Sequence, residues 1–179
     1  ARWSKQYQAS ETEPMEAMDN LIAWLPKNIP PETATTVVHG DYRLDNAIFH
    51  PSEPRILAVL DWELSTLGDP AADFTYHLLM YRMPQSLFAG LGGTDLEALG
   101  IPSEDDYVAA YCARTGRDHL PHTDYLIVFS LFRLAAILHG IKGRIARGTA
   151  ASAHAAQMVE KLAPLADLAL AEALSARLD

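Results

Sequence analysis

Apolar residues recur at steps of three and four near the start of the chain, at Met15, Met18, Leu21, Ile22 and Leu25. This spacing predicts an amphipathic helix over residues 13–27, which Pro30 and Pro31 end. Trp3 and Tyr7 lie one helical turn apart before it. The chain is therefore expected to begin inside or beside a helix.

Between residues 35 and 61 the pattern changes to short runs of β-branched and apolar residues. These runs predict strands at residues 36–38, 47–49 and 56–60. The sequence Pro-Ser-Glu-Pro at residues 51–54 is typical of a turn, so the second and third strands are expected to form a hairpin.

From Pro70 onward the pattern is almost wholly helical. The predicted helices cover residues 70–82, 103–115, 123–147 and 151–178. Asp69 and Ser103 are expected to cap the first two of them. Residues 84–102 predict a loop-rich connection, and the glycines at its centre follow no strand, so we do not interpret them as a phosphate loop. The predicted fold class is α+β and mainly helical.

Composition limits the classes of protein and partner. The chain has 179 residues, of which 49% are hydrophobic and 21% are charged, as in one ordinary globular domain. Fourteen Lys and Arg against 23 Asp and Glu give a net charge of −9, which disfavours nucleic acid and anionic membranes as partners. A small-molecule or cationic partner fits this balance better.

Three features favour a cytoplasmic protein that does not enter a membrane. Cys112 is the single cysteine, so no internal disulfide can form. The apolar stretch at residues 125–138 is interrupted by Arg133 and is shorter than the roughly 20 residues of a membrane span. The first sixteen residues are too polar for a signal peptide.

The candidate chemistry lies around the predicted hairpin. Asp41 and Asn46 are five positions apart in the loop after the first strand, which is the spacing of the catalytic Asp and Asn in protein kinases. Asp61 ends the third strand 15 positions after Asn46, so a tight hairpin would return it to the same edge. Carboxylate and amide oxygens are ligands that Mg²⁺ prefers. We therefore expect these three side chains to face one another.

The motifs His-Gly-Asp-Tyr-Arg-Leu-Asp-Asn at residues 39–46 and Asp-Trp-Glu at residues 61–63, together with the opening Arg-Trp-Ser-Lys-Gln-Tyr, resemble the aminoglycoside phosphotransferase-like, kinase-like family. The most similar members are phosphotransferase domains related to those fused to acyl-CoA dehydrogenases. The resemblance covers about residues 2–82. It implies that residues 1–179 form a protein-kinase-like C-terminal lobe with a short catalytic β-hairpin.

The resemblance also implies an activity and roles for individual residues. The activity is transfer of the γ-phosphoryl group of ATP to a hydroxyl of a small molecule, with Mg²⁺ as cofactor. Asp41 would be the catalytic base, and Arg43 would face the transferred phosphate, although it could equally be a solvated loop cation. Asn46 and Asp61 would bind the metal and, through it, the nucleotide.

Three further residues are expected to support the site. His39 is expected to fix the loop rather than to act as a base. Glu63 adjoins the metal site, but alternation along an extended segment can turn its side chain away. Asp73 is a candidate helix-start residue, and the resemblance implies that it accepts hydrogen bonds from the backbone of the catalytic loop.

The N-terminal lobe with which a kinase binds ATP is not evident in this sequence. The first glycine is Gly40, so no Gly-rich loop precedes the motif, and neither Lys5 nor Lys27 lies in a β-branched strand. We therefore expect an N-terminal lobe of the same protein to be missing through truncation. The chain alone is then expected to bind nucleotide feebly and to turn over no substrate.

Other functions and substrates stay open. A non-catalytic binding module is the main alternative, although a scaffold has no need of two carboxylates and an amide at this spacing. A magnesium-dependent hydrolase is a third possibility, but its two-metal site would require a second acidic cluster, which we do not find in the sequence. The acceptor could be an aminoglycoside, a choline-like or sugar alcohol, or a hydroxylated acyl thioester. Polar residues of the helical part could line its pocket, among them Tyr107, Tyr111, Arg133 and His139.

Overall fold

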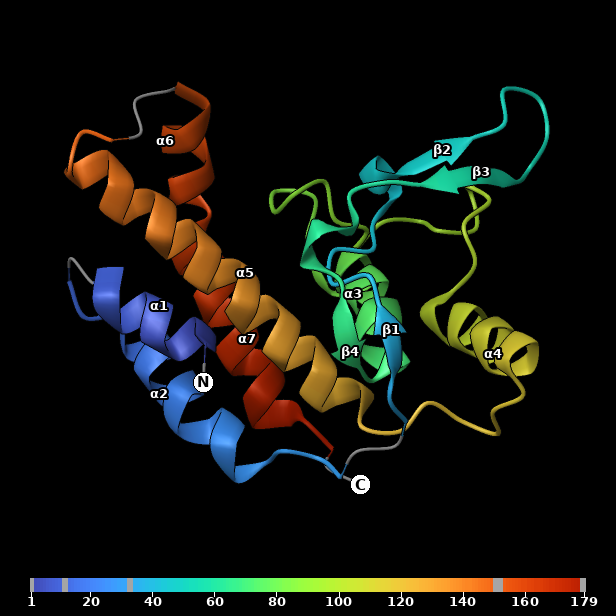
Figure 1. The fold of residues 1–179 in the computed structure, drawn as a ribbon, viewed down its shortest axis with the longest axis horizontal. Helices are drawn as coiled ribbons and strands as arrows, with labels where there is room; N and C mark the ends of the chain where they lie inside the picture. The colour runs from blue at the N-terminus through green and yellow to red at the C-terminus, as the bar shows by residue number, and fades with distance from the viewer. Residues whose placement is uncertain (1, 11–12, 32–33, 150–152, 178–179) are drawn as a thin grey trace.

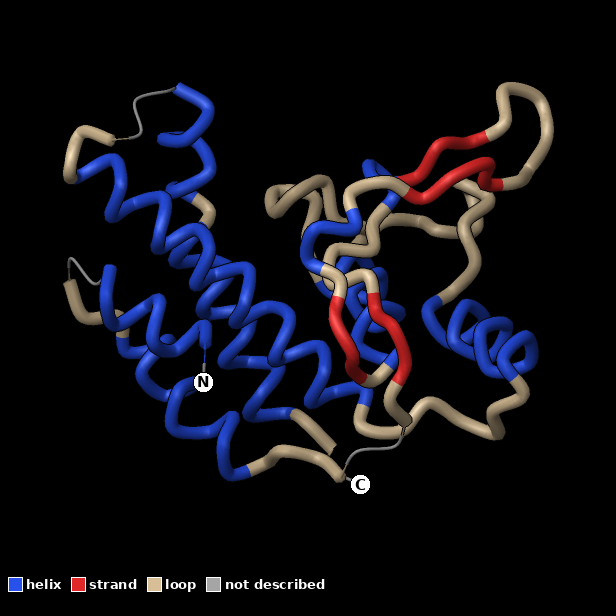
Figure 2. The backbone as a smooth tube through the Cα atoms, viewed as in Figure 1, coloured by secondary structure: helices blue, strands red, loops and turns tan. Residues whose placement is uncertain are grey.

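The computed structural model describes residues 2–10, 13–31, 34–149 and 153–177. The long helix α5 (Thr123–Ala146) runs diagonally through the molecule. On one side it packs against a helical layer of α1 (Arg2–Ser10), α2 (Glu16–Trp24) and α7 (Leu162–Ser175), and on the other against α3 (Pro70–Arg82). The strands lie beyond α3, so the predicted mainly helical α+β class is correct (Figures 1 and 2).

Two small antiparallel sheets carry the strands. β2 (Ala47–Phe49) and β3 (Ile56–Val59) form the predicted hairpin, with a bulge between Ile48 and Phe49. The third strand ends at Val59 rather than at Leu60. β1 (Thr36–Val38) pairs with β4 (Thr66–Gly68), a strand that the sequence pattern did not predict. This second pairing returns the chain from Asp61 to the start of the motif at residues 39–46.

Local capping fixes where α3 and α4 (Glu104–Thr115) begin. The Asp69 carboxylate accepts a hydrogen bond from the Ala71 amide, and Pro70 occupies the first turn, where its missing N–H costs nothing. The Ser103 hydroxyl accepts a hydrogen bond from the Asp106 amide. α3 therefore starts at the predicted residue, and α4 starts one residue after its cap.

Two predicted helices are interrupted at prolines. The helix predicted over residues 13–27 begins at Glu16 and ends in a 3₁₀ turn, Leu25–Lys27, around Pro26. The helix predicted over residues 151–178 is two helices, α6 (Ala153–Glu160) and α7, and residues 151, 152 and 178 lie outside the described part. Pro164 has no N–H to donate to Glu160, and its ring crowds that carbonyl, so the helix breaks at Lys161.

α5 is the central core helix. Seven of its apolar residues are buried, including Ile127, Leu131 and Ala135. Its 24 residues, with a mean hydropathy of 1.6 over the most apolar window, are long and apolar enough to cross a membrane, contrary to the length argument made above. However, 61% of that window is buried inside the fold, as in the core helix of many water-soluble proteins.

α1 lies unusually close to α5. A Cβ added at Gly140 would lie 3.2 Å from the Gln6 side chain, and one added at Gly143 would lie 3.1 Å from the Ser10 carbonyl oxygen. The two glycines are three positions apart and therefore share a helix face. They let the first helix of the chain pack against the backbone of the central one.

The contact between α1 and α5 encloses a buried histidine. His139 is fully buried, lies against the Tyr7 ring and is 3.3 Å from the Ser10 hydroxyl. Burial lowers the pKa of its imidazole, and nearby Lys142 lowers it further, while Glu13 opposes this. Because the folded pKa lies below the unfolded value of about 6.5, the unfolded chain binds more protons below that pH.

We therefore expect the free energy of unfolding to fall as the pH drops below about 6.5. Replacing His139 by Gln should flatten this dependence, and replacing the exposed His119 by Gln should not. Urea unfolding at several pH values between 7.5 and 5 measures the difference. An identical pH dependence in the two variants would contradict the prediction.

Candidate active site

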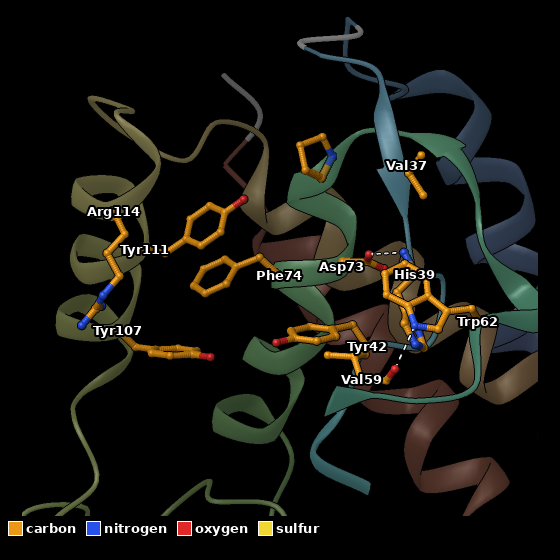
Figure 3. A pocket seen from close by; sticks show the side chains of 11 residues that line it. Val37, His39, Tyr42, Val59, Trp62, Asp73, Phe74, Tyr107, Tyr111 and Arg114 are labelled. Carbon is orange, nitrogen blue, oxygen red and sulfur yellow. Dashed lines mark hydrogen bonds between the residues drawn. The ribbon is translucent and has the colours of Figure 1, made fainter. Parts of the chain in front are cut away.

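The loop after β1 is held by a carboxylate from the first turn of α3. Asp73 accepts a hydrogen bond of 2.5 Å from the backbone amide of His39 (Figure 3) and one of 2.9 Å from that of Gly40. Gly40 has a φ of 82° and lies so close to the Leu64 carbonyl that a Cβ would be 2.5 Å from its oxygen. The residue before Asp41 is therefore fixed in one conformation that favours glycine.

The His39 side chain has a structural position. Its Nε2 is 2.7 Å from the Leu60 carbonyl oxygen and so donates a hydrogen bond to it, while its Nδ1 accepts a hydrogen bond from the Asp41 amide at 3.2 Å. The ring also lies 4.7 Å from the Trp62 ring. With both nitrogens occupied, the neutral imidazole ties the loop to the end of β3 and has no free lone pair for a base.

Asp41 is surrounded by donors. The Asn46 amide nitrogen donates to the Asp41 carbonyl at 2.9 Å and to its carboxylate at 3.2 Å. The Arg43 guanidinium lies 3.3 Å from the same carboxylate. The carboxylate is one-fifth exposed, so it remains open to a further partner.

Tyr76 is a member of this group that the motif did not indicate. Burial raises the pKa of its hydroxyl, and the negative charge of nearby Asp41 raises it further, so the hydroxyl stays protonated at neutral pH. Tyr76 follows Asp73 by three positions on α3. That spacing places both residues on one helix face, so the sequence could have indicated Tyr76 as a site residue.

Asn46 and Asp61 suit a hard cation. Because the Nδ2 of buried Asn46 donates to Asp41, its Oδ1 points elsewhere and is available as a ligand. Asp61 is exposed and adopts the left-handed conformation at a φ of 64°, which is unusual for a residue other than glycine and is often found at functional sites. The hydrogen bond from the Leu60 amide to the Asn46 carbonyl keeps the two segments adjacent.

The expected meeting of three side chains is only partly present. Asp41 and Asn46 are in contact, whereas Asp61 forms no hydrogen bond with either of them. The described residues include no cluster of three or more His, Cys, Asp and Glu side chains that could hold a metal. Mg²⁺ keeps several waters and needs few protein ligands, so Asn46 and Asp61 are a sufficient donor set.

Two other predicted residues lie at the edge of the site. Arg43 is half-exposed and its guanidinium bridges Asp41 and Asp45, at 3.3 Å from each. It is therefore beside the candidate base rather than free in solvent. Glu63 is exposed in the 3₁₀ turn Trp62–Leu64, and none of the described residues pairs with its side chain.

Two cavities adjoin the loop. An open one of about 520 Å³ lies between α4, α3 and β1 and contains Tyr107 and Tyr111 in its wall (Figure 3). A more enclosed one of about 450 Å³ has polar residues in its lining, among them Tyr42, Arg43, Tyr76 and His77. The rest of its lining is mostly apolar and includes Leu79, Met80, Met83, Phe88, Leu134 and Met158. His139 lies in the core instead and lines neither cavity.

Comparisons with known proteins identify the family. The model of the phosphotransferase enzyme family matches residues 1–121. Acyl-CoA dehydrogenase family member 10 of Mus musculus is 47% identical over 169 residues, which are 93% of this chain and 16% of that protein. Acyl-CoA dehydrogenase family member 11 of Rattus norvegicus is 40% identical over 94% of this chain and 22% of its own length.

A solved structure extends the likeness to the whole fold. A protein from Ralstonia eutropha JMP134, provisionally assigned as an aminoglycoside phosphotransferase, superposes with a TM-score of 0.92 at 50% identity. The match covers 98% of this chain and 54% of that protein, so the chain spans about half of its length. The family match, the sequence relatives and the shared fold together establish that this chain belongs to the phosphotransferase enzyme family.

Proposed function

We propose that this chain carries the catalytic base and the metal ligands of an ATP-dependent phosphotransferase that acts on a hydroxyl group. The observation that carries the proposal is the loop at residues 39–46, in which Asp73 fixes the backbone while Asp41 and Asn46 contact each other. Phosphoryl transfer requires mainly positioning and charge stabilisation, and this loop supplies both.

Asp41 would accept the proton of the acceptor hydroxyl as its oxygen attacks the γ-phosphorus of ATP. The bond between that phosphorus and the bridging oxygen breaks, and ADP leaves with the electron pair. Asn46 and Asp61 would hold Mg²⁺, which neutralises phosphate charge when it is bound. Arg43, which is already beside Asp41, would face the transferred phosphoryl group.

The enclosed cavity supports an acceptor that combines a hydroxyl with a hydrocarbon segment. Its lining combines polar residues near Asp41, among them Arg43 and Tyr76, with a larger number of apolar ones. An aminoglycoside carries several positive charges, which an apolar wall would desolvate at high cost. The relatives named as acyl-CoA dehydrogenases agree with an acyl compound, so we favour the hydroxylated acyl thioester among the open alternatives.

In the same proposal, most of the contacts that bind ATP come from an N-terminal lobe of the same protein. Its support is that the chain matches 54% of the solved relative and that no Gly-rich segment precedes Gly40. A non-catalytic binding module remains the alternative. It would leave the contact between Asp41 and Asn46 without a chemical reason.

A comparison of acceptors tests the proposal in the protein with that lobe present. With Mg²⁺ and ATP, we expect faster ADP release for a medium-chain hydroxyacyl thioester than for kanamycin. Replacing Met158 by Lys in the apolar wall should raise KM for the thioester at least about tenfold, because it places a charge against the chain. Replacing the exposed Gln157 by Lys on the same helix is the control.

The outcomes separate the two levels of the proposal. Release of ADP with kanamycin alone would exclude the acyl acceptor but keep the phosphotransferase. No release with any hydroxyl compound, while Mg²⁺ and ATP bind normally, would favour the binding module.

A further inference from the structure

Arg133 is the charged residue that interrupts the apolar face of α5, and its side chain ends at the catalytic loop. Its Nη2 donates a hydrogen bond of 2.5 Å to the carbonyl oxygen of Gly40, which is 93 positions away in the sequence. Its guanidinium carbon lies 5.5 Å from the centre of the Trp3 ring and 5.4 Å from that of the Tyr76 ring. Helices α1, α3 and α5 therefore meet at this one cation.

An ordinary structural role explains this arrangement poorly. None of the Asp and Glu side chains in the described residues forms an ion pair with Arg133, and its Nε is buried without a hydrogen-bond partner. A half-buried cation without a carboxylate is costly to desolvate, and a well-packed apolar residue often serves a fold better. Two ring faces and one carbonyl partly compensate.

The carbonyl that Arg133 contacts belongs to the peptide unit that joins Gly40 to Asp41. Asp73 already holds the amide of Gly40, and the Leu64 carbonyl closes the space beside its Cα. Arg133 adds the third contact, on the oxygen of the following peptide. Three contacts from three parts of the fold thus fix the backbone conformation immediately before Asp41.

Tyr76 connects the same cation to the carboxylate itself. Its ring faces the Arg133 guanidinium, and its hydroxyl lies near enough to Asp41 for the charge of that carboxylate to raise its pKa. The Arg133 side chain consequently restrains the backbone before Asp41 through Gly40, and it also contacts the Tyr76 ring beside the Asp41 carboxylate.

We propose that Arg133, sandwiched between Trp3 and Tyr76, is a positioning residue that holds Asp41 in place for proton transfer. This inference rests on the proposed function, since it gives Asp41 the role of base. It also makes α1 part of the catalytic apparatus, because Trp3 supplies one face of the sandwich. The close approach at Gly140 and Gly143 keeps that helix in position.

Two measurements on the protein with its N-terminal lobe test the inference. Replacing Arg133 by Met should lower kcat roughly 10- to 100-fold and leave KM for ATP and acceptor within about twofold, because orientation is lost and binding is not. Replacing Arg133 by Lys retains a donor for Gly40 and should recover part of the loss. Replacing the exposed Arg144 of the same helix by Met is the matched control.

Hydrogen–deuterium exchange gives a readout that needs no activity. In Arg133→Met, amides of residues 39–46 should exchange faster, while exchange of the core of α5 and Tm match those of Arg144→Met. Unchanged exchange at residues 39–46 would overturn the inference whether or not phosphoryl transfer is observed. Faster exchange throughout the fold would overturn it as well, because it would reveal a general structural role.

A second pair of variants covers the case in which Arg133→Met does not fold. Replacing Trp3 by Leu removes one ring face without altering α5, and replacing it by Phe keeps an aromatic face. Trp3→Leu should speed exchange at residues 39–46, and Trp3→Phe should restore most of the protection. Equal exchange in these two variants would count against the sandwich. Absence of transfer in the unaltered protein would refute the proposed function but not this exchange result.

Discussion

Replacing Asp41 by Asn is expected to lower kcat by about 10²- to 10⁴-fold, because the amide cannot accept the proton of the acceptor hydroxyl. The change keeps the size of the side chain, and Asn46 and Asp61 are untouched, so binding of Mg²⁺ and ATP should persist. Steady-state kinetics combined with calorimetry of nucleotide binding measures the two effects separately. The assay uses the protein with its N-terminal lobe.

Asp45 offers a matched control four positions further along the chain. Its carboxylate is 80% exposed and pairs with Arg43 in the same way as that of Asp41, at 3.3 Å. Replacing Asp45 by Asn removes the same charge next to the same arginine, and we expect less than a threefold change in kcat for it. Equal losses in the two variants would mean that charge near Arg43, and not a base at residue 41, explains the activity.

Replacing Gly40 by Ala is expected to disrupt both the loop and the activity. The alanine would have to keep a φ of 82°, and its Cβ would lie 2.5 Å from the backbone oxygen of Leu64. That oxygen cannot move without disturbing the 3₁₀ turn after β3. The left-handed conformation alone costs about 1–2 kcal/mol, and the overlap adds to it. We expect a lower Tm and at least about a hundredfold loss of kcat.

Gly93 separates these two causes. It has a similar φ of 79°, but a Cβ there would meet no atom within 4 Å. Gly93→Ala should therefore lose about 1–2 kcal/mol of stability and keep its activity. If Gly40→Ala were no worse than Gly93→Ala by urea unfolding and kcat, the close contact with Leu64 would be unimportant.

The local pattern determines most of the helices and the hairpin. Periodicity located α3, α4 and α5 to within a residue at each end, and Asp69 and Ser103 mark the starts of the first two. β4 escaped prediction because three residues ending in glycine carry little strand signal, and their partner strand lies 30 positions earlier. The break before α7 was predictable from Pro164, since a proline within a helix removes a hydrogen bond.

In the candidate site too, contacts within one loop could be predicted from the sequence, and contacts between distant helices could not. The contact between Asp41 and Asn46 lies within one loop, so the spacing of the motif was enough to predict it. The contacts of Tyr76 and Arg133 depend on how α3 and α5 cross behind that loop, which no local pattern records. A lone arginine in an apolar helix was visible in the sequence, but its partner, a backbone carbonyl, has no sequence signature.

The two small sheets also affect how the chain behaves in solution. Each contains two strands among the described residues, so each strand has one edge that no other strand pairs. On the β2–β3 hairpin, Ile48, Phe49, Ile56 and Leu57 are exposed beside these edges. Open edges with apolar side chains favour pairing between molecules. We therefore expect the protruding hairpin to favour association between copies of this chain on its own.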